Sequence, residues 1–108
     1  MVVWRAFVYD GAMTDVELLT HEPDENRYAM YVGGELASVV DYRIRGDQIS
    51  FHHTYTAPHM RGKGLAAKIV EFAVNDVEST TEYRIVPMCW YVGVWFDEHP
   101  ERAGLLSR

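Results

Sequence analysis

The chain has 108 residues, a length that fits a single domain with one hydrophobic core. Hydrophobic residues make up 48% of it, which excludes a disordered chain, and its formal net charge of −6 argues against general nucleic-acid binding, because such proteins neutralise phosphates with Lys and Arg. No apolar run approaches the roughly 20 residues that span a bilayer, and a single cysteine excludes an internal disulfide. We therefore expect a cytoplasmic protein without a membrane partner.

The first residues stand apart from the rest of the chain. Met13 begins the segment MTDVELLTHEP, which is a plausible start in its own right. We interpret residues 1–12 as an N-terminal extension that the native protein need not contain, and residues 13–108 as a single domain. Peptide mass mapping of the native protein tests this interpretation.

From Arg27 onward the pattern predicts strands. Residues 27–32 (RYAMYV) are rich in strand-forming residues, and Gly33-Gly34 is typical of a hairpin turn. Residues 35–45 alternate with a period of two, which predicts a half-buried strand. Its apolar face is formed by Leu36, Val40, Tyr42 and Ile44.

A third strand is predicted over residues 48–57, after a turn at residues 45–47, and Pro58 ends it because proline cannot donate to a sheet. Strict alternation places Phe51, His53 and Tyr55 on one face and His52, Thr54 and Thr56 on the other.

The second half of the chain alternates helix and strand. Apolar residues at helical spacing predict a helix over residues 65–78, the segment at 82–88 predicts a strand, and residues 89–98 predict a second, largely buried helix. The fold class is therefore α+β, with a mostly antiparallel sheet, one strand–loop–helix–strand crossover and a C-terminal helix.

Two glycines flank a lysine where the first helix must begin, in Arg61-Gly62-Lys63-Gly64-Leu65-Ala66. Glycine disfavours helices, so its use here indicates that the backbone itself is needed. The first N–H groups of a helix have no intrahelical partner and its dipole favours anions there. A strand, a glycine loop and a helix start thus predict an anion site suited to phosphate, with Arg61 and Lys63 adding charge.

This hexapeptide resembles the [Q/R]-x-x-G-x-[G/A] signature of GNAT-type N-acetyltransferases. The order FHHT, RGKGLA, helix, VPMCWYV and HPE is similar to a minimal, one-domain branch of that superfamily, that of YjdJ-like proteins and of N-acetyltransferase domain-containing protein 1. The resemblance covers about residues 16–101 and implies a compact GNAT-like fold.

The resemblance also implies how acetyl-CoA is bound. Its pyrophosphate would lie on the loop, and its pantetheine arm would pair with backbone in a gap between residues 50–57 and 83–88. The residues implied to bind it are Thr54, Tyr55, Thr56, Arg61, Gly62, Lys63, Gly64, Leu65 and Ala66. No metal is implied, since the pattern holds no cluster of Cys and His.

His53 and Cys89 are the catalytic candidates. An amine must lose a proton to attack a thioester, and a histidine can accept one near neutral pH. His53 matches the histidine of the family's HT motif, although a core histidine is the plainer alternative. Cys89 stands where the predicted strand ends and the second helix begins, and a thiol at a helix N-terminus becomes more acidic. It is an acyl-carrying nucleophile, a proton-transfer group or a small packing residue.

Three functions stay open at this point. The leading one is a small acetyl-CoA-dependent N-acetyltransferase that acts on a small amine or a protein lysine. The second is a CoA or acyl-CoA binding module without turnover, which has no need for His53 or Cys89. The third is an α+β interaction domain in which RGKG is an ordinary turn. The acceptor and the oligomeric state are not readable from the sequence.

Overall fold

The computed structural model describes residues 4–8 and 16–108, and within them six strands form one twisted sheet in chain order. The strands are β1 (Trp4–Val8), β2 (Val16–Glu22), β3 (Arg27–Val32), β4 (Glu35–Arg45), β5 (Gln48–Thr56) and β6 (Arg84–Pro87). The α-helices are α1 (Leu65–Thr80) and α2 (Trp90–Asp97), and the 3-10 helices are η1 (Pro23–Glu25), η2 (Pro58–Met60) and η3 (Pro100–Leu106).

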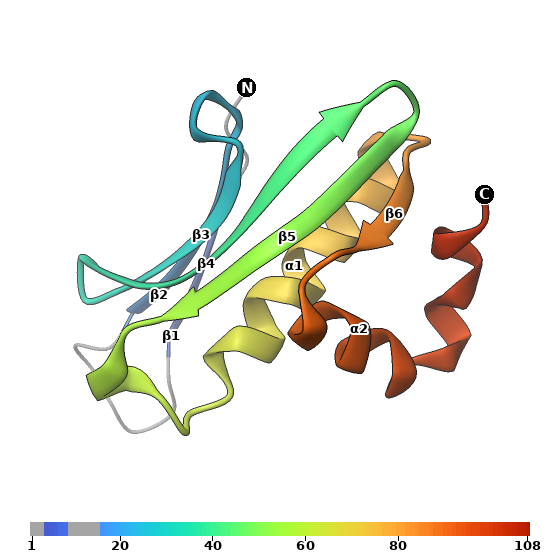
Figure 1. The fold of residues 1–108 in the computed structure, drawn as a ribbon. Coiled ribbons are helices and arrows are strands. Elements are labelled where there is room, and N and C mark those ends of the chain that lie inside the picture. Colours follow the sequence, from blue (N-terminus) through green and yellow to red (C-terminus); the bar gives the residue numbers. More distant parts are fainter. Residues whose placement is uncertain (1–3, 9–15) are drawn as a thin grey trace.

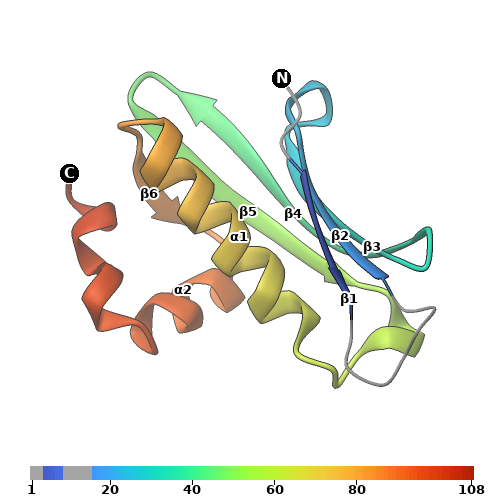
Figure 2. The same ribbon diagram turned by 180° about the vertical axis from the view of Figure 1, so that it is seen from behind.

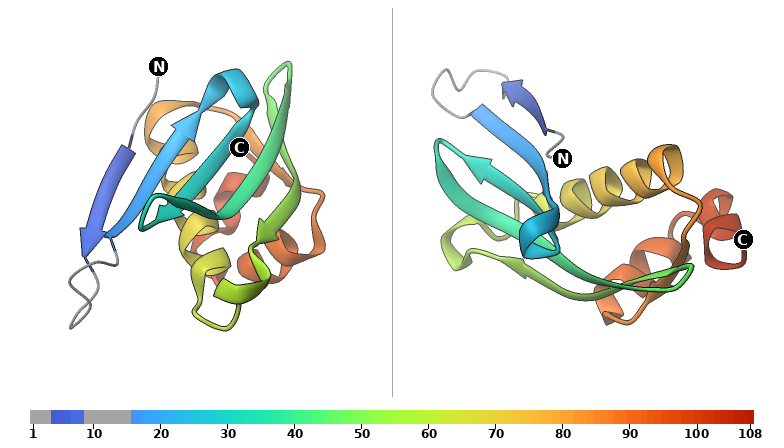
Figure 3. Two further views of the ribbon diagram at one scale, coloured as in Figure 1. Left: turned by 90° about the vertical axis from the view of Figure 1, so that its left-hand side faces the viewer. Right: turned by 90° about the horizontal axis from the view of Figure 1, so that it is seen from above.

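The predicted α+β architecture is confirmed. Neighbouring strands from β1 to β5 are antiparallel, and β6 runs parallel to β5. α1 makes the crossover between β5 and β6, because a parallel neighbour is reached only through such a connection. It lies behind the sheet in Figure 1 and in front of it in Figure 2. Figure 3 shows that the sheet curves around α1, while α2 and η3 lie beyond β6.

β1 and β2 lie ahead of the region in which the sequence predicts strands. The alternation of β2 is hidden because Glu17 occupies a buried position, where Lys68 of α1 holds its carboxylate at 3.0 Å. A buried charge needs such a partner, and this one is far along the chain. β1 falls within residues 1–12 and pairs with β2. The proposed extension stays a prediction, and Met13 lies outside the described residues.

α1 carries the predicted apolar stripe and ends at Thr80, two residues beyond the predicted end. Its stripe packs on the core face of the sheet, where the ring of Phe72 meets that of Tyr28 at a centroid distance of 5.8 Å. Each such large side chain contributes about 1.5–3 kcal/mol of transfer free energy. The buried residues of α1 are Leu65, Ile69, Val70, Phe72, Ala73, Val74 and Val77.

A β-bulge in β5 changes the predicted faces of its second half. Tyr42 pairs with Phe51, but Asp41 pairs with His53, so His52 is an extra residue on β5. An inserted residue shifts the alternation by one. The prediction that His53 shares a face with Phe51 is therefore wrong, and so is the prediction that His52 and His53 face opposite ways. Both histidines are exposed on the face away from α1.

The same shift turns Thr54 and Thr56 toward the core side, where the Thr56 hydroxyl lies 2.9 Å from that of Ser38. Ile44, predicted to share the buried face of β4, is 45% exposed. It lies one residue from the end of β4, at the margin of the core, so the period of two overstates its burial.

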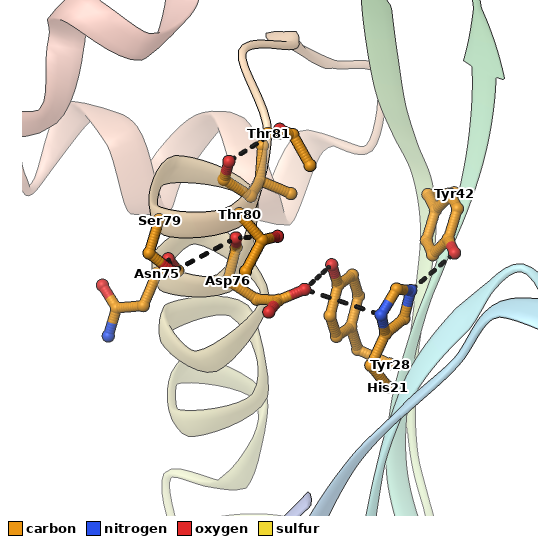
Figure 4. A network of polar contacts seen from close by, with 9 residues as sticks. His21, Tyr28, Tyr42, Asn75, Asp76, Ser79, Thr80 and Thr81 are labelled. Carbon is orange, nitrogen blue, oxygen red and sulfur yellow. Dashed lines mark hydrogen bonds and ion pairs between the residues drawn. The ribbon is translucent and has the colours of Figure 1, made fainter. Parts of the chain in front are cut away.

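A polar network joins the sheet to the C-terminal half of α1 (Figure 4). Asp76 accepts a 2.7 Å hydrogen bond from the Tyr28 hydroxyl and lies 3.5 Å from Nδ1 of His21. The His21 ring stacks on Tyr28 at 4.3 Å, and its Nε2 lies 2.7 Å from the Tyr42 hydroxyl. The pairing of β2 with β3 sets His21 beside Tyr28.

This network predicts a loss of stability in acid. Burial lowers the pKa of His21 below its usual 6.5, although the Asp76 carboxylate acts the other way. The unfolded chain therefore binds the proton more tightly, so the stability from neutral His21 is present above the unfolded pKa and is lost as the pH falls through it. We expect the free energy of unfolding to fall between about pH 7.5 and about pH 5.5, and His21→Gln to flatten that slope. Urea titrations at each pH measure it, and an unchanged slope would contradict the expectation. The matched control is His52→Gln, at an exposed histidine.

Candidate functional site

The glycine loop has a backbone conformation that favours glycine at two positions. Gly62 and Gly64 have φ of 81° and 74°, in the left-handed region that favours glycine. Gly64 is the N-cap of α1, and the first intrahelical bond runs from the Lys68 N–H to its carbonyl at 3.2 Å. A Cβ built on either glycine would meet nothing within 4 Å. The space over the helix start is therefore open to a ligand, and side chains there would intrude on it.

β5 and β6 part beside this loop. Their pairing covers Gln48–Phe51 and Arg84–Pro87 and ends with the bond from the Cys89 N–H to the Phe51 carbonyl at 2.9 Å. Figure 1 shows β6 beside the first half of β5 only. The predicted gap is thus partly misplaced, because residues 83–88 are largely paired. It opens later, between residues 52–56 of β5 and the start of α2.

A cleft of about 530 Å³ occupies this opening, between the second half of β5, the glycine loop and the first turn of α2. Its volume falls within the range of small-molecule sites. It is lined by His53, Thr54, Tyr55, Thr56, Met60, Arg61, Gly62, Gly64, Leu65, Ala66, Trp90 and Tyr91.

The structure brings together the residues predicted to bind acetyl-CoA, since all of them except Lys63 line this one cleft. Arg61 also bonds the Thr56 carbonyl at 3.2 Å, which ties the loop to the end of β5. Sequence reasoning did not assign Met60, Trp90 or Tyr91 to the cleft. Trp90 is 77% exposed at the start of α2, and the only signal in the sequence was an aromatic residue near a predicted helix start.

Cys89 lies behind the cleft wall and does not line it. It is the N-cap of α2, which begins one residue later than the predicted helix, and its Sγ lies 3.4 Å from Oγ1 of Thr54. Burial raises the pKa of the thiol, but hydrogen bonds from the Thr54 side chain and from the backbone at Tyr91, Val92 and Thr54 together lower it below its usual 9.0. The thiolate is therefore easier to form here than in water.

His53 lines the cleft and is hydrogen bonded to a carboxylate. Its Nδ1 lies 3.0 Å from Oδ2 of Asp41, and its side chain is 60% exposed. The alternative of a core histidine is thus wrong. A carboxylate at Nδ1 fixes the ring and leaves Nε2 to exchange a proton. Asp41 was not predicted, because an unbroken hairpin would pair it with His52, and only the bulge brings it to His53.

Residues 4–8 and 16–108 hold neither a metal-binding cluster nor a membrane-spanning helix. No group of three or more His, Cys, Asp or Glu side chains lies together in a way that could hold a metal ion. No helix in the described part of the chain is long and apolar enough to span a bilayer.

The sheet is mixed, and its one parallel pair of strands separates where a glycine loop begins a helix. This arrangement defines a GNAT-like α+β protein. A family model described as GCN5-related N-acetyl-transferase matches residues 27–105, and the chain belongs to this family. Membership of this family supports acetyltransferase activity in general. The match begins at β3, and the narrower YjdJ-like branch stays a prediction. No curated protein matches the chain.

Proposed function

We propose that this protein is an N-acetyltransferase that moves an acetyl group from acetyl-CoA to an amine. The observation that carries the proposal is the cleft, because one continuous cavity is lined by the glycine loop, by the unpaired half of β5 and by His53. A phosphate-binding loop alone would suit many ligands. Here the loop continues into the opening beside β5, next to His53, and this combination suits acyl transfer from a long, phosphorylated thioester.

The diphosphate would be held by the N–H groups around Gly62 and Gly64, with Arg61 adding charge. The pantetheine arm would follow Thr54–Thr56, whose backbone has no β6 partner. Leu65, Ala66 and the face of Trp90 supply apolar wall. Lys63 is exposed beside the loop and would act at longer range.

Bound acetyl-CoA would supply the thioester carbonyl that the amine attacks. Nε2 of His53 would take the proton that the amine releases, and Asp41 would stabilise the charged ring that forms. Cys89 stands one layer behind, linked through Thr54. A direct transfer needs it only for proton transfer or packing. Tyr91 also lines the cleft, but burial and then the Glu98 carboxylate raise the pKa of its hydroxyl, which makes it a weaker proton donor to the leaving thiolate.

The experiment that tests the function is a thermal-shift titration with CoA followed by turnover of acetyl-CoA over an amine panel. CoA at 100 times its dissociation constant should add about 2.7 kcal/mol of stability, which raises Tm by roughly 10 °C in a domain of this size. Absence of any shift would contradict the CoA site itself. A shift without turnover of any amine would favour the alternative, a CoA or acyl-CoA binding module.

A further inference from the structure

A second groove lies on the sheet face opposite α1, beside the cleft but distinct from it. It has a volume of about 350 Å³ and is lined by Arg43, Arg45, Gln48, Ser50, His52 and Met88. We call it the arginine groove. None of these residues lines the acetyl-CoA cleft. Arg43 pairs with Ser50 and Arg45 with Gln48, so neighbouring strands present one continuous polar floor.

The two arginines of the groove are exposed and uncompensated. Both lie on the same side of β4, two residues and thus about 7 Å apart. Neither guanidinium forms an ion pair or a side-chain hydrogen bond with any residue that the structure describes. Asp41 on the same strand is engaged with His53. In a chain of net charge −6, two adjacent free guanidinium groups form a local site for an anion.

The groove includes the chain neighbours of the candidate catalytic residues. His52 and Met88, which line it, are the chain neighbours of His53 and Cys89. Because of the β-bulge, His52 and His53 both lie on this face of the sheet. Arg43 lies two residues from Asp41, again about 7 Å along the strand. A molecule in the groove can therefore reach His53 from the side of the sheet opposite α1.

We propose that the arginine groove binds the anionic group of the amine acceptor, so that the substrate is a small amine that also carries a carboxylate or a phosphate. This inference rests on the proposed acetyl transfer. Arg43 and Arg45 hold the anion, and the amine is set about one or two strand residues away, beside His53. A guanidinium binds carboxylate and phosphate with paired N–H donors, so both anions suit the groove. The volume of the groove favours a small molecule over a long peptide segment.

The test compares amines that differ only in the anion. ε-Aminocaproate and its amide form one pair, and phosphoethanolamine and ethanolamine form another. Each is titrated at one ionic strength into CoA-saturated protein, and backbone NMR shifts at residues 43–52 report binding. We expect the anionic member to bind about tenfold more tightly, as charge-assisted hydrogen bonds predict. The double variant Arg43→Gln/Arg45→Gln should reduce that preference to less than about threefold.

The matched control is Arg102→Gln, which removes the same charge from an arginine that pairs with Glu78 of α1, and it should keep the preference. Equal binding of charged and neutral amines, or a preference that survives the double variant, overturns the proposal. If tighter binding of an anionic ligand is seen only with lysine peptides rich in Glu, the assignment of the acceptor as a small molecule is overturned. These titrations need no acetyl transfer. If the protein acetylates no amine, the proposed function is refuted, and the titrations still show whether the arginine groove binds the anionic group.

Discussion

His53→Ala should lower the turnover of acetyl-CoA by about 10²–10⁴-fold, the usual contribution of a general base. The ring lines the cleft, and Asp41 at 3.0 Å from Nδ1 holds it in one orientation. Its removal takes away the acceptor of the amine proton and leaves the glycine loop intact. We therefore expect CoA affinity, measured by calorimetry, to change by less than about threefold, since phosphate contacts carry it. Cys89→Ala, made in parallel, should also lower turnover more than CoA affinity.

His59→Ala is a closely matched control for His53→Ala. His59 is 59% exposed and its Nε2 lies 3.0 Å from a Glu35 carboxylate, so the pair resembles His53 with Asp41 but lies outside the cleft. It should retain turnover. If His53→Ala lost turnover and CoA affinity in equal measure, packing damage would explain both, and the base assignment would fail.

Gly64→Ala should weaken CoA binding by about tenfold or more, because a Cβ would enter the space above the first N–H groups of α1 and the turn would lose its anion-facing geometry. The left-handed φ of 74° also costs an L-residue about 1–2 kcal/mol of stability. Calorimetry with CoA and chemical denaturation measure the two effects separately.

Gly46→Ala is the control that separates the effect of backbone strain from the effect of a blocked ligand contact. Gly46 has φ of 60°, meets nothing within 4 Å of an added Cβ and lies in the β4–β5 turn outside the cleft. It should lose similar stability and keep CoA affinity. Equal loss of affinity in both variants would mean that backbone strain alone weakens binding, and the phosphate cradle would lose its main support.

Much of the fold could be predicted because its signals are local. The apolar stripe of α1, the alternation in β4 and the glycine pair before α1 each depend on residues a few positions apart. β2 was missed because its buried Glu17 is explained only by Lys68, in a helix much later in the chain. The place of His21 could not be predicted for the same reason, since its partners Tyr42 and Asp76 come from other elements.

The candidate site also has one part that the local sequence predicts and another that only the tertiary structure decides. A glycine's freedom of φ and the N–H groups of a helix start are properties of the local chain, so the position of the glycine loop could be predicted from Gly62 and Gly64, while its anion binding stays a prediction. The face of His53 does not, because one extra residue at His52 reverses the alternation. Pairing between strands depends on the tertiary structure, and only that pairing gives His53 the Asp41 carboxylate and places His53 on the face that carries Arg43 and Arg45.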